Sequence, residues 1–408
     1  MTSPEIIIRD CTIIPWIAAS SDNFLGTITS KMEVLRNKFG MGLDKFFGLQ
    51  AFELSYLGVL AILPYIVVQP VVTHSIIFVT LIVIFNAVYQ KLTFRRIDTE
   101  DKYVFITGCD TGIGNAVARR LSGEGLSVFA GCLNQDGPEA SKLKSEYSNI
   151  QIVQIDITDD NSVNKAFDVV EKKVKDKGLW AFINNAAIYG AGDIEFSPLE
   201  EYRRLAEVNL FGLVRVTKKF IPLVRQSKGR IVNVTGSNGK IGIPCNSAFC
   251  MTKYGQEGFT DVLRMEMRKF GIKVITVEPG NFSASTAMLN KSKLPVYEKE
   301  FEKMWQDSSA SIKKTYGRKY VDGMLKSLTA LSSKSCSTIA PIVDAIEMTV
   351  IAKNPKQRYL VDGSSSLVDQ DNLLIRIGSY IPERLVNLLL DRAYNSRELL
   401  SLPKEKSA

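Results

Sequence analysis

The stretch Tyr103–Gly114, YVFITGCDTGIG, decides the fold of this chain. Its first five residues form a short apolar, β-branched run typical of a buried strand, and the NAVARRLSGEG that follows has apolar residues at helical spacing. Between them, Gly108, Gly112 and Gly114 allow a tight turn and the close approach of a pyrophosphate, which the free N–H groups of a helix N-terminus attract. Strand, glycine loop and helix together predict a dinucleotide-binding unit.

Strands and helices continue to alternate after this unit. Apolar runs predict further strands over Leu126–Leu133, over the stretch ending at Asp156, over the stretch ending in Asn184-Asn185-Ala186-Ala187, over Arg230–Gly236 and over Lys273–Gly280. Six such repeats predict an α/β fold, a doubly wound parallel (Rossmann) sheet, in which ligands bind at the C-terminal ends of the strands. The glycines and the polar residues that end these runs all fall at those ends.

The ordered set of motifs resembles the short-chain dehydrogenase/reductase family. The resemblance covers about residues 100–395 and rests on the glycine loop, on Asn209 within EVNLFG, on the strand GRIVNVTG, on Lys253 and on Pro279-Gly280. The segments TGCDTGIG, VFAGCLNQDGPEA, GLWAFINNA and MWQDSSASIKKTYGRKY are similar to the branch of 17β-hydroxysteroid dehydrogenase type two, the retinol dehydrogenases and D-β-hydroxybutyrate dehydrogenase. A member of this branch is expected to transfer a hydride between a nicotinamide cofactor and an alcohol or ketone.

The resemblance assigns cofactor contacts to residues at several strand ends. In the glycine loop they are Gly108, Thr111, Gly112, Ile113 and Gly114. The family pattern implies that Asp156 and Ile157 hold the adenine, that Asn185, Ala186 and Ala187 line the cofactor, that Pro279 and Gly280 lie beside the nicotinamide, and that Lys253 bonds its ribose. Ala187 stands where the family usually has glycine and adds a methyl group there.

The end of the second strand bears on the choice between NAD and NADP. An acid at this position normally binds the ribose 2′-hydroxyl, whereas a nearby Arg or Lys accommodates a 2′-phosphate. Here Cys132 holds the position, followed by Leu133, Asn134, Gln135 and Asp136. With no base to neutralise a phosphate and with Asp136 placed to repel one, NAD is predicted rather than NADP.

The catalytic positions depart from the family pattern. Members use a Tyr four residues before the Lys, whose ammonium lowers the phenol pKa, together with a Ser that orients the substrate oxygen and an Asn that steadies the Lys through water. Asn209 and Lys253 are retained, but Phe249 occupies the Tyr position and Gly236 the Ser position. Phenylalanine fills the aromatic slot without a proton to transfer, and Ser237 is the candidate replacement for the missing hydroxyl.

An uncharged segment precedes the Rossmann repeats. From Ser55 to Gln90 the sequence has no formal charge if His74 is neutral. The length of this run, 36 residues, exceeds the roughly 20 residues of a spanning helix. Pro64 and Pro70 interrupt it, so a single tilted span and a hairpin of two short ones both remain open. Basic residues on both flanks favour the hairpin, with both ends in the cytosol.

The expected organisation therefore has five parts. They are an N-terminal cytosolic segment (1–50), a transmembrane span or hairpin (51–91), the NAD-binding domain with the catalytic centre (102–288), a substrate cap (289–345), and an amphipathic, membrane-associated C-terminal segment (346–408). The cap is rich in Lys and aromatic residues. This composition fits a lipophilic lining of a substrate pocket and an ordinary amphipathic helix pair equally well.

Composition excludes several other classes of function. The single histidine, His74, excludes Ser-His-Asp catalysis and histidine-rich metal sites, and no metal is expected. The six cysteines form no CxxC pair and are expected to be reduced thiols facing the cytosol. The 51 Lys and Arg residues exceed the 43 Asp and Glu residues without forming basic blocks, which suits an anionic membrane surface better than a nucleic acid.

Two hypotheses follow for the function. The first is a membrane-anchored NAD(H)-dependent oxidoreductase in the endoplasmic reticulum, facing the cytosol, for a lipophilic secondary alcohol such as a steroid or retinoid. The second is a non-catalytic NAD-binding protein that senses cofactor or sequesters a lipid, which Phe249 and Gly236 favour. A mitochondrial hydroxy acid dehydrogenase is a weaker third reading, because the first 50 residues do not resemble a transit peptide. The family also implies a homo-oligomer.

Overall fold

The computed structural model describes residues 62, 69, 71–85, 88, 95–366, 368–378 and 380–394. The chain divides into two compact units, Met1–Thr93 and Phe94–Ala408. The segment expected to be cytosolic, 1–50, and most of the expected membrane segment, 51–91, lie outside the described residues.

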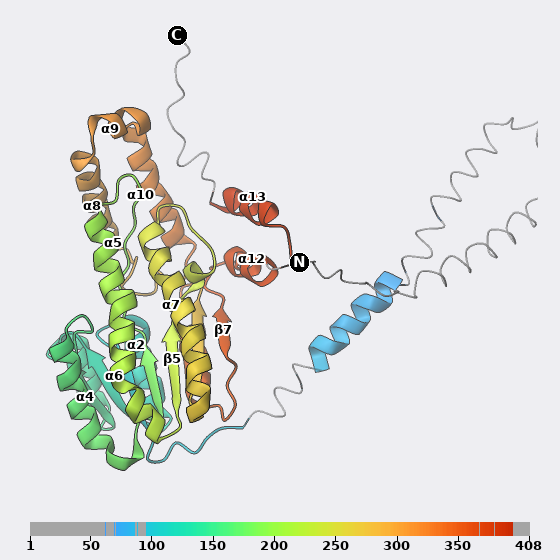
Figure 1. Ribbon diagram of the computed structural model, residues 1–408. Coiled ribbons are helices and arrows are strands. Elements are labelled where there is room, and N and C mark those ends of the chain that lie inside the picture. Colours follow the sequence, from blue (N-terminus) through green and yellow to red (C-terminus); the bar gives the residue numbers. More distant parts are fainter. Residues whose placement is uncertain are drawn as a thin grey trace, which may run out of the picture. The chain divides into compact units, whose positions relative to one another are not determined.

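A seven-stranded parallel sheet forms the centre of the second unit (Figure 1). Its order is β3-β2-β1-β4-β5-β6-β7, and the chain reverses direction across the sheet between β1 and β4, where doubly wound folds bind their ligands. The strands are β1 (Tyr103–Thr107), β2 (Ser127–Cys132), β3 (Ile150–Gln154), β4 (Ala181–Asn184), β5 (Arg230–Val234), β6 (Lys273–Pro279) and β7 (Arg358–Val361). The predicted α/β fold is confirmed.

Helices cover both faces of the sheet because its strands are apolar on both sides. The helices described in this unit are α2 (Gly112–Gly123), α3 (Pro138–Glu146), α4 (Asp160–Val174), α5 (Leu199–Ala206), α6 (Leu213–Gln226), α7 (Ser247–Met267), α8 (Leu294–Asp307), α9 (Ala310–Tyr316), α10 (Arg318–Ser333), α11 (Ala340–Ile351), α12 (Gln370–Gly378) and α13 (Glu383–Ala393). Alternate residues of each strand enter different cores. Val104 and Ile106 pack with α2, α3 and α11, whereas Phe105 packs with α4, α6 and α7.

Two parts of this unit differ from the sequence-based expectation. The strand β7 was not predicted, because its four residues follow the polar stretch NPKQ and give too short a pattern. The cap residues fitted a lipophilic lining and an amphipathic helix pair equally well, but 289–345 contain three complete helices, α8, α9 and α10, and the start of α11; the three complete helices extend beyond one end of the sheet (Figure 1).

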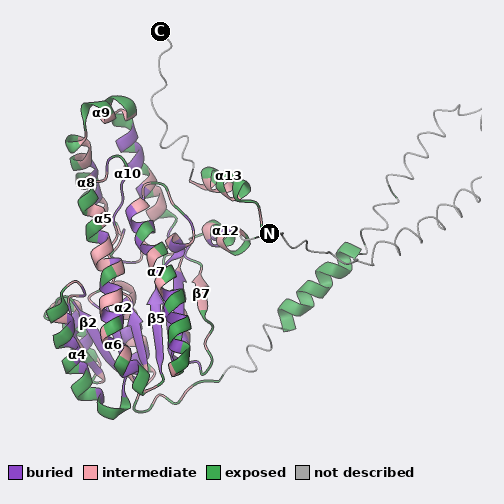
Figure 2. Cartoon of the chain, viewed as in Figure 1, coloured by how far each residue is buried: buried purple, intermediate pink, exposed green. Residues whose placement is uncertain are grey.

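Burial separates the central sheet from the C-terminal helices. Every residue of β5 is buried, whereas α13 has no buried residue (Figure 2). Its exposed side chains include Leu385 and Leu388, and α13 packs against α12, which begins after β7.

The described residues of the first unit include a helical stretch over 71–85 with exposed apolar side chains. Among the described residues of the whole chain, no helix is both long enough and apolar enough to cross a membrane.

A buried arginine joins the sheet to α11. Arg230, at the start of β5, is 1% exposed and donates hydrogen bonds of 2.7–2.9 Å to the carbonyl oxygens of Thr349, Val350 and Ala352. Its guanidinium lies 4.1 Å from the centre of the Trp180 ring. Burial lowers the pKa of Arg230 to about 10, which remains well above neutral, so the group is charged and caps the carbonyl end of α11.

Replacing this arginine by leucine is expected to destabilise the fold. Arg230→Leu removes three charge-assisted hydrogen bonds and leaves buried carbonyl groups unsatisfied, so about 3 kcal/mol of unfolding free energy is expected to be lost. Chemical denaturation of the full chain, followed by circular dichroism, measures the effect. Arg268→Leu at an exposed position is the control, and equal stability of the two variants would contradict the capping role.

Candidate functional site

The glycine loop after β1 turns through backbone conformations that favour glycine. Gly108 has φ +73° and Gly112 has φ +63°. Gly114 lies so close to the loop that an added Cβ would stand 2.3 Å from the Gly108 carbonyl oxygen and 2.5 Å from Asn185 Nδ2. The loop therefore closes tightly and brings the first turn of α2 beside it.

The first turn of α2 is open to an anion. The N-cap residue Thr111 accepts no hydrogen bond through its side chain, and the first turn contains no acidic residue. By contrast, α4 is closed by Asp159, whose carboxylate accepts from the N–H groups of Asn161 and Ser162. An uncapped helix N-terminus at a glycine loop fits a phosphate group, so the donor set agrees with a bound dinucleotide.

Asn185 fixes the loop from the neighbouring strand end. Its side-chain Nδ2 donates to the carbonyl oxygens of Thr107 (2.9 Å) and Gly108 (3.1 Å). Its backbone N–H and that of Ala186 donate to the Thr107 hydroxyl at 3.0 and 3.1 Å. Asn185 thus shapes the loop as well as facing the cavity.

A cavity of about 590 Å³ opens at this edge of the sheet. It brings together nine of the predicted cofactor residues: Gly108, Thr111, Gly112, Ile113, Asp156, Ile157, Asn185, Ala186 and Ala187. The other predicted cofactor residues, which are Gly114, Cys132, Lys253, Pro279 and Gly280, are not among its lining residues. The loop after β6 and the helix α8 close the opposite side with Thr286, Ala287, Met288, Lys293, Val296, Tyr297 and Glu300. Of these the sequence singled out Tyr297 alone, as one of the aromatic residues of the cap.

At the end of β2 the structure exposes Leu133 rather than Cys132. Cys132 is fully buried, and burial raises its thiol pKa to about 12 with a further contribution from Asp110. Leu133 is 61% exposed and lines the cavity. The Asp110 carboxylate accepts from the backbone N–H groups of Leu133 and Asn134, both at 3.0 Å, and so sets the path of this loop. Its place inside the glycine loop was the sequence signal for this role.

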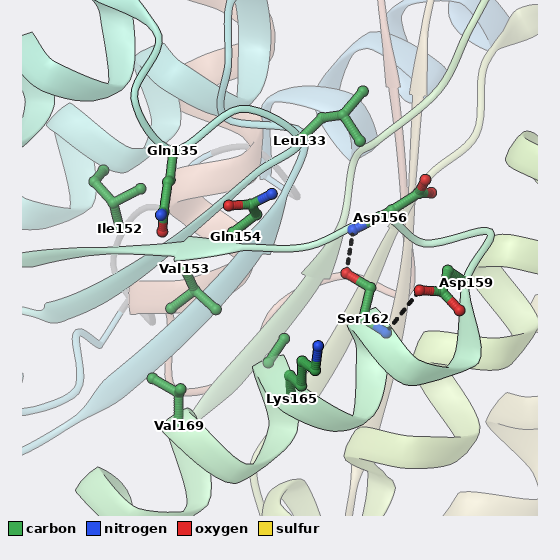
Figure 3. A pocket seen from close by; sticks show the side chains of 11 residues that line it. Leu133, Gln135, Ile152, Val153, Gln154, Asp156, Asp159, Ser162, Lys165 and Val169 are labelled. Carbon is green, nitrogen blue, oxygen red and sulfur yellow. Dashed lines mark hydrogen bonds between the residues drawn. The ribbon is translucent and has the colours of Figure 1, made fainter.

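Asp156 lines both the cavity and a second hollow, which Figure 3 shows. Its carboxylate accepts from the backbone N–H and hydroxyl of Thr158 at 2.9 and 2.7 Å. Its own N–H donates to the Ser162 hydroxyl, while the Ser162 N–H donates to Asp159 (Figure 3). The second hollow, about 580 Å³ along β3 and α4, is lined by one base, Lys165, and by the two acids Asp156 and Asp159.

Lys253 lies on α7 behind the cavity wall. It is 3% exposed, and its Nζ donates to Gln256 Oε1 at 3.1 Å and to the Val234 carbonyl at 3.4 Å. Burial lowers the pKa of its ammonium to about 8, while the charge of Glu257 acts in the opposite direction. Near neutral pH this lysine is therefore charged but close to its midpoint.

Asn209 holds the cavity wall. It lies in a π-helical turn over Glu207–Gly212 and is fully buried. Its Oδ1 accepts from the Ile188 N–H at 2.8 Å, and its Nδ2 donates to the Ile188 carbonyl at 2.9 Å and to the Thr252 hydroxyl at 3.3 Å. The two bonds to Ile188 fix the loop after β4 in one position.

The aromatic ring of Phe249 is buried one helical turn before Lys253. It is 6% exposed, its centre lies 5.4 Å from Lys253 Nζ, and it meets the Tyr189 ring edge-on with 5.0 Å between ring centres. Tyr189 lines the cavity, whereas Phe249 does not. The only aromatic hydroxyl in this ring pair thus belongs to Tyr189.

Tyr189 is a residue that the sequence did not single out. Its hydroxyl donates to Asn246 Oδ1 at 2.5 Å, and burial raises its phenol pKa well above the usual value. A phenol with a raised pKa remains a neutral hydrogen-bond donor rather than an acid poised near neutral pH. Its position in the loop after β4, at the ligand-binding edge of the sheet, was the available signal.

The segment after β5 explains why glycine occurs at position 236. Gly236 has φ +143° and ψ 161°, a conformation that L side chains rarely adopt. An added Cβ would meet no atom closer than 3.7 Å, so backbone conformation rather than space disfavours serine there. Ser237 begins the 3-10 turn Ser237–Gly239, is 5% exposed and does not line the cavity.

The loop after β6 is packed from behind by the segment after β7. An added Cβ on Gly280 would stand 2.7 Å from Asp369 Oδ2 and 2.8 Å from the Gly363 N. Gly280, next to Pro279, is therefore held by the C-terminal segment. Among the residues that the structure describes, no group of three or more His, Cys, Asp or Glu side chains is arranged to hold a metal ion.

Comparison with known proteins agrees with this geometry. Residues 102–295 match the short chain dehydrogenase family. Mitochondrial D-beta-hydroxybutyrate dehydrogenase of Mus musculus is 38% identical over 265 residues, covering 63% of this chain and 76% of that protein. For 17-beta-hydroxysteroid dehydrogenase type 6 of Bos taurus the identity is 39%, covering 72% of this chain and 89% of that one. For retinol dehydrogenase 16 of Homo sapiens it is 36%, with 71% and 88% covered.

A solved structure supports the fold separately. A short-chain dehydrogenase from Streptomyces avermitilis has a TM-score of 0.54 and 21% identity, covering 72% of this chain and 98% of its own. The predicted family and branch are confirmed by these matches together with the glycine loop and the retained Asn209 and Lys253. The chain belongs to the short chain dehydrogenase family.

Proposed function

We propose that the protein is an NAD(H)-dependent oxidoreductase that interconverts a lipophilic secondary alcohol and its ketone or aldehyde. The observation that carries this proposal is the cavity in which the glycine loop, the uncapped first turn of α2 and Asp156 lie along one edge of the sheet. The diphosphate of a dinucleotide can accept hydrogen bonds from the free N–H groups of α2, and its ribose or adenine can donate to the Asp156 carboxylate. A dinucleotide therefore matches both the helix N-terminus and the carboxylate.

The chain's residues take separate roles in this proposal. Gly108, Gly112 and the first N–H groups of α2 hold the diphosphate, and Asp156 and Ile157 hold the adenine end. Pro279 and Gly280 flank the nicotinamide, and Lys253 bonds its ribose. When bound, the nicotinamide ring supplies the carbon that donates or accepts a hydride.

NAD is proposed rather than NADP because the adenine end of the site is acidic. Asp110 and Asp156 line the cavity, and Asp156 and Asp159 face Lys165 in the adjoining hollow. A 2′-phosphate placed here would meet more carboxylates than ammonium groups, and its charge would be poorly compensated.

A lipophilic substrate is supported by the apolar part of the cavity wall. Ala187, Ile188, Val208, Met288 and Val296 contribute apolar side chains. Relatives named for a 17-beta-hydroxysteroid and for retinol suggest the same substrate class, whereas the relative named for D-beta-hydroxybutyrate keeps a small hydroxy acid as a comparison substrate.

We further propose the expected organisation into five parts, with residues 289–345 as the substrate cap. The uncharged run Ser55–Gln90 supports a membrane anchor at 51–91, and the exposed leucines of α13 support membrane association of the segment 346–408. An endoplasmic reticulum location with the catalytic domain in the cytosol, contact with membrane lipid, and a homo-oligomer complete this proposal.

A non-catalytic NAD-binding protein is the second candidate. Two observations favour it: Phe249 has no proton to transfer, and the backbone at Gly236 disfavours a serine. In this case Lys253 serves cofactor binding alone, and the cavity senses the cofactor or sequesters a lipid.

Turnover by the unmodified protein distinguishes the two candidates. NADH formation is measured with detergent-solubilised full chain over a panel of steroids, retinols and 3-hydroxybutyrate, beside Lys253→Ala and the exposed control Lys269→Ala. The oxidoreductase predicts NADH formation that Lys253→Ala abolishes and Lys269→Ala retains. NADH binding without turnover on any substrate would instead establish the non-catalytic candidate.

A further inference from the structure

A glutamine side chain lies between the two retained catalytic-site residues. Gln256, one turn after Lys253 on α7, is 1% exposed. Its Nε2 donates a short hydrogen bond to the Asn209 carbonyl oxygen, and its Oε1 accepts from Lys253 Nζ at 3.1 Å. The family resemblance implied a water between these partners, but in this chain an amide side chain fills the place.

The orientation of this amide is determined by its partners. A carbonyl oxygen accepts only and an ammonium donates only, so Nε2 must face Asn209 and Oε1 must face Lys253. Asn209 is itself fixed to the backbone of Ile188 by two hydrogen bonds. The Asn209 side chain is therefore held by Ile188 of the cavity wall, and the Asn209 backbone carbonyl holds Gln256, which accepts a hydrogen bond from the Lys253 ammonium.

We propose that Gln256 is a positioning residue that fixes the Lys253 ammonium and closes the route by which water would exchange protons with it. The functional meaning of this closure rests on the proposed function, in which Lys253 bonds the cofactor.

The chemistry of an amide explains the closure. A water molecule between an ammonium and a carbonyl accepts a proton on one side and releases one on the other, whereas a carboxamide does neither near neutral pH. The second acceptor of the ammonium, the Val234 carbonyl at 3.4 Å, has no proton to exchange either. Lys253 is thus suited to bind the ribose of the cofactor, and poorly suited to pass protons from solvent to a reacting group.

The electrostatic surroundings of Lys253 are simple enough to test. Burial lowers its pKa to about 8, and the charged group acting on it is Glu257 of the same helix. The Glu257 carboxylate is engaged by the Thr235 hydroxyl, by Lys240 after the turn that follows β5, and by Arg358 of β7. The Phe249 ring faces the ammonium from the preceding turn without a titratable group.

Two substitutions at position 256 separate the two parts of the proposal. Gln256→Leu removes both hydrogen bonds but fills the space, so the ammonium loses an acceptor and its titration midpoint is expected to fall by about one pH unit. Gln256→Ala leaves room for water, so exchange of the Lys253 ammonium protons with solvent is expected to accelerate by about tenfold or more.

Both effects are measured by NMR on the full chain in detergent with lysine labelled at Cε and Nζ, and Lys253→Met assigns the signal. The measurement needs neither cofactor nor turnover. Gln226→Ala, at an exposed position on α6, is the control and should change neither quantity. If the alanine or leucine variant does not fold, Gln256→Asn, which is too short to reach both partners, should also accelerate exchange.

The outcomes are distinct for the two proposals. An unchanged midpoint in a folded Gln256→Leu protein, or unchanged exchange in Gln256→Ala, would overturn the role of Gln256. If both change as expected while the unmodified protein binds no NADH at any pH, Gln256 still positions Lys253 and the proposed cofactor function is what fails.

Discussion

The Phe249→Tyr variant is expected to oxidise a lipophilic alcohol at least about 10²-fold faster than the unmodified protein, and up to about 10⁴-fold faster if proton transfer limits the rate. The ring at position 249 already lies 5.4 Å from Lys253 Nζ and is held by the Tyr189 ring. A hydroxyl added to that ring would have its pKa lowered by the neighbouring ammonium. Steady-state NADH formation at saturating NAD measures the gain.

The pH dependence of this variant follows from the lysine. Because the pKa of Lys253 is about 8, the ammonium that favours the ionised phenol is lost above that pH. The phenol must also be ionised to accept the proton of an alcohol, so the enhancement is expected to rise with pH as the phenol ionises and to decline above about pH 8, where the ammonium is lost. Phe259→Tyr, a partly buried phenylalanine on the same helix, is the matched control and should give no gain.

Adding Gly236→Ser should help less than the family pattern suggests. The backbone at position 236 has φ +143°, and holding a serine there costs on the order of 1–3 kcal/mol unless the turn rearranges. A Phe249→Tyr variant that binds NADH with unchanged affinity but shows no increase in turnover would mean that the missing phenol is not what restricts this protein.

The sequence predicted those parts of the molecule that depend on local pattern. The β1–glycine loop–α2 unit and the retained Asn209 and Lys253 could be located because each occupies a fixed place in a short motif. The contact at the end of β2 was assigned to Cys132, and the structure turns that side chain inward, since successive strand residues point to opposite faces. The residue that lines the cavity at this point is Leu133, the next residue along the chain.

Long-range side-chain partnerships could not be predicted in the same way. Arg230 caps a helix more than a hundred residues later in the chain, and Gln256 finds its partner in Asn209 through the packing of α7 against the π-helical turn. An Arg or a Gln in a sequence does not by itself predict a capping or bridging role. The role of such a buried side chain depends on the hydrogen-bond partners that the fold places beside it.

The Gly114→Ala variant is expected to lose NADH affinity by about 10²-fold or more, equivalent to two charge-assisted hydrogen bonds. An alanine Cβ would overlap the Gly108 carbonyl oxygen at 2.3 Å and Asn185 Nδ2 at 2.5 Å. The Gly108 carbonyl is backbone and cannot rotate away from the added Cβ as a flexible side chain would. The first turn of α2 must therefore move away from the loop, which withdraws its N–H groups from the proposed diphosphate site. Fluorescence titration with NADH measures the loss.

Gly123→Ala provides the matched control at the other end of α2. Its Cβ would meet no atom within 4 Å, so NADH affinity should be unchanged and the helix should gain roughly 0.5–1 kcal/mol of stability. The same comparison separates two reasons for glycine in this loop. Gly112 is constrained by its φ of +63°, with nothing nearer to an added Cβ than Thr286 at 3.8 Å, whereas Gly114 is constrained by protein atoms.

Gly112→Ala should therefore weaken NADH binding less than Gly114→Ala, because strain at one residue is relieved more cheaply than a clash between α2 and its own loop. If folded Gly114→Ala binds NADH as tightly as the unmodified protein, the loop does not hold the dinucleotide. The cavity would then have to be occupied by a ligand that does not use the N-terminus of α2.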